Sequence, residues 1–158
     1  MKAIRNATVA IIAVAATTIG GSAIASDPLE KAIKARKAQM QLYAWNLGQL
    51  GAMAKGAVPY DAAAATSAAN NLLAVVSLDS MTMWPQGSDS TAMPGKTAAK
   101  LESWTTWPAI GEKSQAMNAA ATAMAAAAGG GLDSLKGAMG AVGQGCKGCH
   151  ETYREKKK

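Results

Sequence analysis

The two cysteines and the one histidine of the chain lie together in the pentapeptide Cys146-Lys147-Gly148-Cys149-His150. Thiols three residues apart share one face of a helix, so each can add across a vinyl group of the same haem while the adjacent imidazole binds the iron. This Cys-x-x-Cys-His spacing is the attachment sequence of a c-type haem. It predicts one covalent haem c per chain, with Cys146 and Cys149 as thioether donors and His150 as the proximal iron ligand.

A Cys-x-x-Cys pair also occurs in redox dithiols and in zinc sites. A redox dithiol follows a strand, and zinc takes four ligands. Upstream of Gly145 the sequence has no βαβ pattern and no further Cys or His. A zinc site would need a carboxylate or a second chain, so haem attachment is the favoured interpretation.

The N-terminus has the pattern of a signal peptide. Lys2 and Arg5 precede an apolar run over residues 7–19, and Ala23-Ile24-Ala25 supplies the small residues that a signal peptidase reads. The sequence therefore predicts a signal peptide over residues 1–25, cleaved after Ala25. The run is shorter than the roughly 20 residues of a membrane span, so an uncleaved anchor is the weaker alternative. Export agrees with haem attachment outside the bacterial cytoplasm, and both predict the periplasm.

The mature chain is mildly basic. Removing residues 1–25 takes away two of the 16 Lys and Arg and none of the 10 Asp and Glu, which leaves a net charge of +4. The basic residues are not interleaved with aromatic ones, and Lys156-Lys157-Lys158 is most simply a solvated tail. We expect no nucleic-acid binding and no membrane span after cleavage.

Composition and periodicity predict an all-α fold. The chain has many Ala, no Phe, and no Asn-Gly or Asp-Gly turn between alternating segments. Short links join the first predicted helix to the second and the third to the fourth, which favours an antiparallel four-helix bundle. The predicted helices span 28–55, 61–78, 106–128 and 132–153.

The first helix has clear start signals. Asp27 should be its N-cap, Pro28 its first residue, and Glu30 should complete a capping box. Asp61 should cap the second helix in the same way. Residues 79–96 are rich in Pro, Gly and Ser, which predicts a long connection, followed by a short helical turn at 98–104. The apolar stripe of the first helix is expected to run through Ile33, Met40, Leu47 and Ala54.

The last helix indicates where the haem lies. Its apolar residues recur at alternating steps of three and four, and the two thiols continue this stripe. We therefore expect the haem inside the bundle, covalently bound near one end. The stripe consists of Leu132, Leu135, Met139, Val142, Cys146, Cys149 and Tyr153.

These features together resemble the class II c-type cytochromes, the cytochrome c′ family. The similarity covers nearly the whole chain after residue 25, and it implies a four-helix-bundle haem domain over residues 26–158. Three segments carry it: the terminal motif at 143–154 with its aromatic-Arg pair, the turn at 55–61, and Trp104 before the third long helix.

The resemblance also implies which residue faces the iron. In the family, an Arg on the first helix is followed four positions later by the residue at the sixth coordination site, and here these are Arg36 and Met40. High-spin members have a group there that cannot bind iron. Met40 can, so the chain resembles the methionine-ligated branch called cytochrome c-556. A Met on a helical stripe is also common core filler, and the residue alone leaves both roles open.

Two arginines are candidate haem contacts on the same resemblance. Arg36 and Arg154 would lie near the haem edge, where a guanidinium can pair with a propionate. As surface cations, they would have no such role. Tyr153 and Trp45 are expected to pack as core or haem-pocket aromatics.

Two functions follow. If His150 and Met40 saturate the iron, the protein is a one-electron carrier between periplasmic redox proteins. The alternative is a five-coordinate, cytochrome c′-like protein that binds nitric oxide or carbon monoxide. No second His could act as an acid or base over the iron, so we expect no enzyme. Family members pair through their first two helices. The sequence does not show whether this chain does so, and both a monomer and a homodimer stay open.

Overall fold

The computed structural model describes residues 27–156, and the predicted signal peptide falls outside this range. These residues form the predicted all-α fold. A short 3-10 helix η1 (Met81–Met83) and a short helix α3 (Glu102–Thr105) accompany the long helices. The four long helices are α1 (Pro28–Ala54), α2 (Ala62–Val76), α4 (Ala109–Ala127) and α5 (Leu132–Tyr153).

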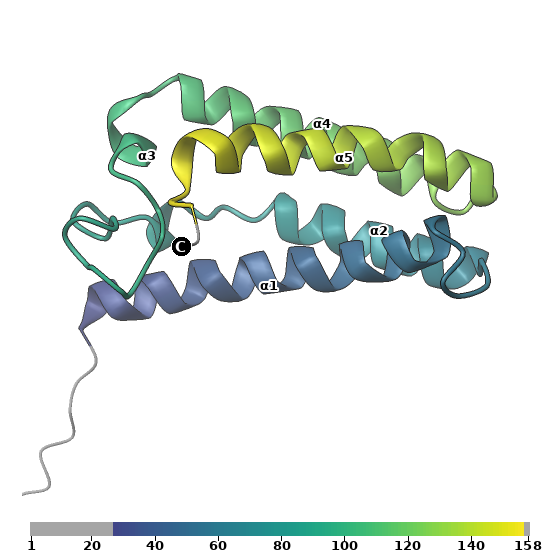
Figure 1. The fold of residues 1–158 in the computed structure, drawn as a ribbon, viewed down its shortest axis with the longest axis horizontal. Helices are drawn as coiled ribbons and strands as arrows, with labels where there is room; N and C mark the ends of the chain where they lie inside the picture. The colour runs from purple at the N-terminus through teal and green to yellow at the C-terminus, as the bar shows by residue number, and fades with distance from the viewer. Residues whose placement is uncertain (1–26, 157–158) are drawn as a thin grey trace, which may run out of the picture.

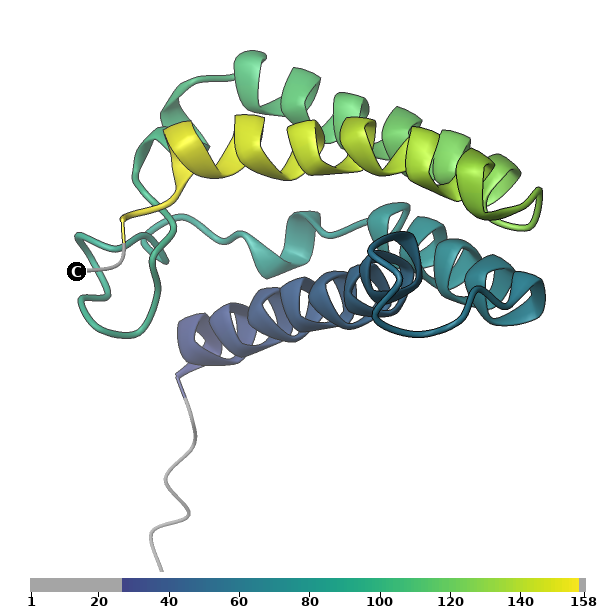
Figure 2. The same ribbon diagram turned by 45° about the vertical axis from the view of Figure 1, so that its right-hand side comes forward.

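The long helices form an antiparallel bundle of two pairs. Helix α1 packs on α2 and α4 packs on α5, while α2 contacts α4 and α1 contacts α5 across the core. The connection, which we define as residues 77–101, lies at the end of the bundle where α1 begins and α5 ends (Figures 1 and 2). Within residues 27–156, no helix is both long enough and apolar enough to span a bilayer.

Side-chain caps begin α1 and α2 as predicted. Asp27 accepts a 2.8 Å hydrogen bond from the Leu29 amide, and Asp61 accepts a 2.7 Å bond from the Ala64 amide. The predicted capping box is wrong, because the Glu30 carboxylate instead lies 2.9 Å from Lys96 Nζ in the connection. Helix α4 begins later than predicted, at Ala109, because α3 and Pro108 precede it.

The core lies between the two helix pairs and combines a few large side chains with many alanines. Each fully buried Leu contributes about 1.5–3 kcal/mol, and the alanines let the helix backbones approach closely. Gly145 does the same between α4 and α5, since a Cβ there would lie 2.9 Å from Met117 Sδ. The largest fully buried apolar side chains are Leu50, Leu72, Met124, Leu135 and Val142.

Helix α1 keeps most of the predicted stripe and buries polar residues beside it. Ile33 is buried, and Leu47 and Ala54 pack against the core as expected, whereas Met40 is exposed. The polar residues buried on α1 are Arg36, Gln39 and Asn46. Trp45, expected in the core or the haem pocket, is 69% exposed. The expectation for Trp45 rested on its aromatic side chain, and on α1 the buried position goes to its neighbour Asn46 instead.

Candidate functional site

Helix α5 carries both thiols and the imidazole on its last turns. Cys146 and Cys149 are free and half-buried, and burial raises the pKa of both thiols. Burial also lowers the pKa of His150, and the charge of Arg154 lowers it further. A neutral imidazole is the form that binds iron. Two free thiols beside this imidazole on one helix fit the donor set that covalent haem requires.

Tyr43 on α1 faces these thiols. Burial, and then the proximity of Cys146 and Cys149, raises the pKa of Tyr43 to about 12. Its hydroxyl also donates a 3.4 Å hydrogen bond to the Val75 carbonyl of α2. Met40 precedes Tyr43 by three residues, and residues at this spacing lie on the same side of a helix. Met40 is 38% exposed, so it is not part of the packed core.

Arg36, one turn before Met40, is 3% exposed and is held by the connection. Its Nη1 donates to Ser88 Oγ at 2.6 Å and to the Met83 carbonyl at 3.3 Å. Its Nη2 donates to the Ser88 carbonyl, and to Thr97 Oγ1 at 2.9 Å. Four of the five guanidinium N–H groups therefore have partners within the protein. Burial lowers the pKa of Arg36, and nearby Asp89 opposes this shift.

Two tryptophans enclose the same guanidinium. The Arg36 Cζ lies 4.8 Å from the ring centre of Trp84 and 5.6 Å from that of Trp104. The two rings contact each other at 5.5 Å, and Trp104 Nε1 donates to the Trp84 carbonyl at 2.9 Å. Sequence reasoning missed this cluster. Two Trp residues flanking a Pro- and Gly-rich connection were the signal that could have found it.

The connection also joins the end of α5. The Lys100 amide donates to the Tyr153 carbonyl at 3.0 Å, and the Glu155 amide donates to the Ala98 carbonyl at 2.9 Å. Ala99 and Arg154 form an isolated antiparallel bridge between these bonds. The Tyr153 side chain is buried, as expected, and its hydroxyl accepts a 3.0 Å bond from Thr106.

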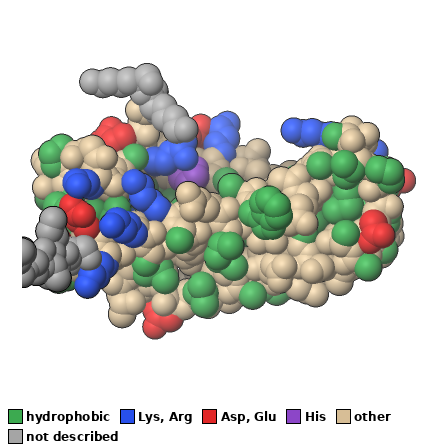
Figure 3. Space-filling model, turned by 90° about the horizontal axis from the view of Figure 1, so that it is seen from below, with side chains coloured by type: hydrophobic (Ala, Val, Ile, Leu, Met, Phe, Trp, Pro, Cys, Tyr) green, Lys and Arg blue, Asp and Glu red, His purple; other side chains and the backbone are tan. Residues whose placement is uncertain are grey.

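Basic side chains surround the imidazole at the surface. Figure 3 shows the histidine with Lys and Arg side chains beside it, in the left half of the view. Arg154 is exposed there, four residues after His150 on the chain. Its predicted contact with a propionate stays a prediction. Within residues 27–156, no cluster of three or more His, Cys, Asp or Glu could hold a metal ion.

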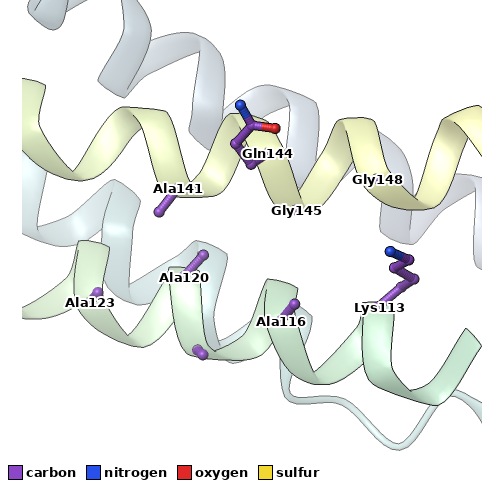
Figure 4. A pocket seen from close by; sticks show the side chains of 9 residues that line it. Lys113, Ala116, Ala120, Ala123, Ala141, Gln144, Gly145 and Gly148 are labelled. Carbon is purple, nitrogen blue, oxygen red and sulfur yellow. The ribbon is translucent and has the colours of Figure 1, made fainter. Parts of the chain in front are cut away.

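A groove of about 570 Å³ runs along the outer side of α4 and α5. Figure 4 shows its alanine walls, with Lys113 and Gln144 at the rim. The groove borders the candidate haem site, because Gly148 between the two thiols lines it, although neither thiol nor His150 does.

The bundle with its thiol pair and imidazole on the last helix defines a class of haem c proteins. The family description "Cytochrome C′" matches residues 31–154 of the chain. The chain therefore belongs to the cytochrome c′ family and, like other members, carries one covalently attached haem c. Its membership of the cytochrome c-556 branch stays a prediction.

Known relatives agree with this family. Cytochrome c-554 of Cereibacter sphaeroides is 43% identical over 134 residues, which cover 81% of this chain and 96% of the relative. The structure of a cytochrome c′ from Rhodobacter spheriodes superposes with a TM-score of 0.79 at 38% identity, covering 82% and 98% of the two chains.

Two further structures concern ligands and assembly. A ferrous variant of cytochrome c′ from Alcaligenes xylosoxidans holds bound NO; its TM-score is 0.72 at 32% identity, covering 84% and 98% of the chains. Another cytochrome c′ shows ligand-controlled dimer dissociation; its TM-score is 0.75 at 31% identity, covering 82% and 98%.

Proposed function

We propose that this chain is a periplasmic haem c protein that binds a small gas such as nitric oxide at its iron. Cys146 and Cys149 would hold the haem, and His150 would be the proximal ligand. The support is membership of the cytochrome c′ family together with the relative that holds bound NO. These comparisons favour gas binding over the electron carrier that the sequence put first. The predicted signal peptide supports the periplasm.

Electron transfer is the second candidate function, and Met40 supports it. Met40 lies on the side of α1 that bears Tyr43, which faces the two thiols, and its side chain is outside the packed core. A thioether at this position could bind the iron opposite His150. Met/His ligation holds a haem in the arrangement of electron-carrying cytochromes. In this case a gas would bind only by displacing Met40.

Visible spectra of the holoprotein and of Met40→Leu separate the two functions. If Met40 binds the iron, the ferric wild type is low-spin with a weak long-wavelength sulfur-to-iron band, and the variant loses this band and binds carbon monoxide faster. The substitution conserves volume and should cost less than ~1.5 kcal/mol of stability. Met81→Leu is the control, since Met81 is an exposed Met in the connection. A wild type that is already high-spin, with an unchanged variant, favours an open gas site.

The proposal extends to assembly. Leu42 and Trp45 are exposed apolar side chains three residues apart on the outer side of α1. Relatives of this family can be dimeric, and a second copy of the chain would cover such side chains. We propose a homodimer that uses this side of α1. Sedimentation of the holoprotein should show a dimer that Trp45→Glu converts to a monomer; a wild-type monomer would contradict it.

A further inference from the structure

We infer that Arg36 is a positioning residue: it fastens the connection to α1 and, through the connection, ties α1 to the end of α5. This tie would set how firmly Met40 is held toward the iron, and in that respect it rests on the second candidate function, in which Met40 binds the iron. The inference differs from the propionate contact expected for Arg36 from the sequence, because it assigns the guanidinium to partners inside the protein.

The first observation is how completely the connection holds Arg36. Its four N–H bonds reach three residues, Met83, Ser88 and Thr97, that are far apart along the connection. Trp84 and Trp104 cover the guanidinium from the sides. Only a planar group with a fixed fork of donors can serve these acceptors together. A carboxylate from a propionate would have to use the remaining Nε or displace one of these bonds.

The second observation is that Arg36 and the end of α5 form hydrogen bonds to adjacent residues of the connection. Thr97 accepts a bond from Arg36, and the next residue, Ala98, accepts one from the Glu155 amide. Lys100 then donates to the Tyr153 carbonyl. Only two adjacent residues of the connection thus separate the hydrogen bond of Arg36 from that of α5. A movement of one should therefore be passed directly to the other.

The third observation is where this tie meets the candidate ligands. Arg36 precedes Met40 by four residues on α1, and Tyr153 follows His150 by three residues on α5. Each candidate iron ligand therefore lies within one turn of an anchor point. A shift of the connection would move α1 relative to α5 at this point. It would therefore change the distance between Met40 and His150.

The test compares Arg36→Lys and Arg36→Gln with the wild-type holoprotein. Lysine keeps the charge but has no planar fork of donors, so both variants should lose the bonds to the connection to a similar extent. We expect faster hydrogen exchange at the Lys100 and Glu155 amides, and carbon monoxide binding to the ferrous protein faster by about tenfold, within the range of coupled sites. Lys37→Gln is the control: Lys37 is an exposed neighbour that donates a single bond, to the Lys96 carbonyl. It should change neither measurement.

If Arg36→Lys behaves as wild type while Arg36→Gln does not, Arg36 acts through its charge and the inference is overturned. Unchanged amide exchange in both variants overturns it as well. If neither variant folds, Thr97→Val removes one acceptor and should give the same changes in milder form. A wild type without a Met ligand refutes the effect on Met40, whereas amide exchange still decides the tie between α1 and α5.

Discussion

The two ends of the bundle are tied in different ways. At the far end, the Tyr60 hydroxyl donates to the Ala128 carbonyl at 2.8 Å and accepts from the Gly131 amide at 3.0 Å. At the haem end, the buried Arg36 binds the long connection through four bonds. Tyr60 thus bonds directly to the turn between α4 and α5, whereas Arg36 reaches α5 only through the connection.

The difference lies in how much freedom the chain has at each end. At the far end, the turns between α1 and α2 and between α4 and α5 are short, and Gly131 has a φ of 110°. Turn geometry therefore determines the path of the chain there. The connection is long and contains little regular structure, so hydrogen bonds from Arg36 and from the end of α5 hold it. The candidate iron ligands sit at the end whose shape depends on such bonds.

The largest expected effect is the loss of covalent haem, and its structural consequences should be confined to one end of the bundle. Cys146→Ala combined with Cys149→Ala should abolish covalent attachment, so haem staining on a denaturing gel disappears. Lys147→Ala, between the thiols, should keep the stain. Hydrogen exchange should increase in the connection and remain slow at Gly131. Stain retained in the double variant would refute the assignment of the thiols.

A packing change in α5 should come next in size. In Gly145→Ala the new Cβ would meet Met117 Sδ at 2.9 Å and its Cα at 3.2 Å. The backbone atom cannot move cheaply, so we expect a loss of about 1–3 kcal/mol in denaturant unfolding. Gly143→Ala is the matched control, with nothing within 4 Å of its Cβ. It should gain up to about 1 kcal/mol. Equal stability of the two variants would contradict this account.

The same substitution at both ends tests the comparison directly. Tyr60→Phe removes both far-end hydrogen bonds and should cost about 1–2 kcal/mol without changing the visible spectrum. Tyr153→Phe removes one bond to Thr106, so it should cost less but alter the spectrum. Unfolding curves and ferric spectra of the two holoproteins measure this. A spectral change from Tyr60→Phe would show that the ends are not independent.

The smallest expected effect concerns the ion pair that links α1 to the connection. The hydrogen bond from Lys96, and then its charge, lowers the pKa of Glu30. A lowered pKa in the folded state stabilises the protein above the unfolded pKa of Glu30, and this contribution is lost as pH falls through the folded value. Lys96→Met should therefore raise the pKa of Glu30 toward its ordinary range in an NMR titration. Lys34→Met should raise it less, because Lys34 acts only through its charge. Equal shifts would contradict the hydrogen bond.

The sequence alone determined the fold class and the cofactor. Caps at Asp27 and Asp61, the helical periodicity and the short links fix four helices, because these signals act between residues close along the chain. The Cys-x-x-Cys-His motif is likewise local, since one helix turn brings its three groups to one side.

Three features follow from the folded chain and not from local sequence signals: the partners of Arg36, the exposure of Trp45 and the ion pair of Glu30. Each depends on how the connection folds back over α1, and a Pro- and Gly-rich segment carries no periodicity that would fix its path. Arg36 donates to four acceptor atoms that only the folded connection brings together. Its role therefore could not be predicted from the residues next to it in the sequence.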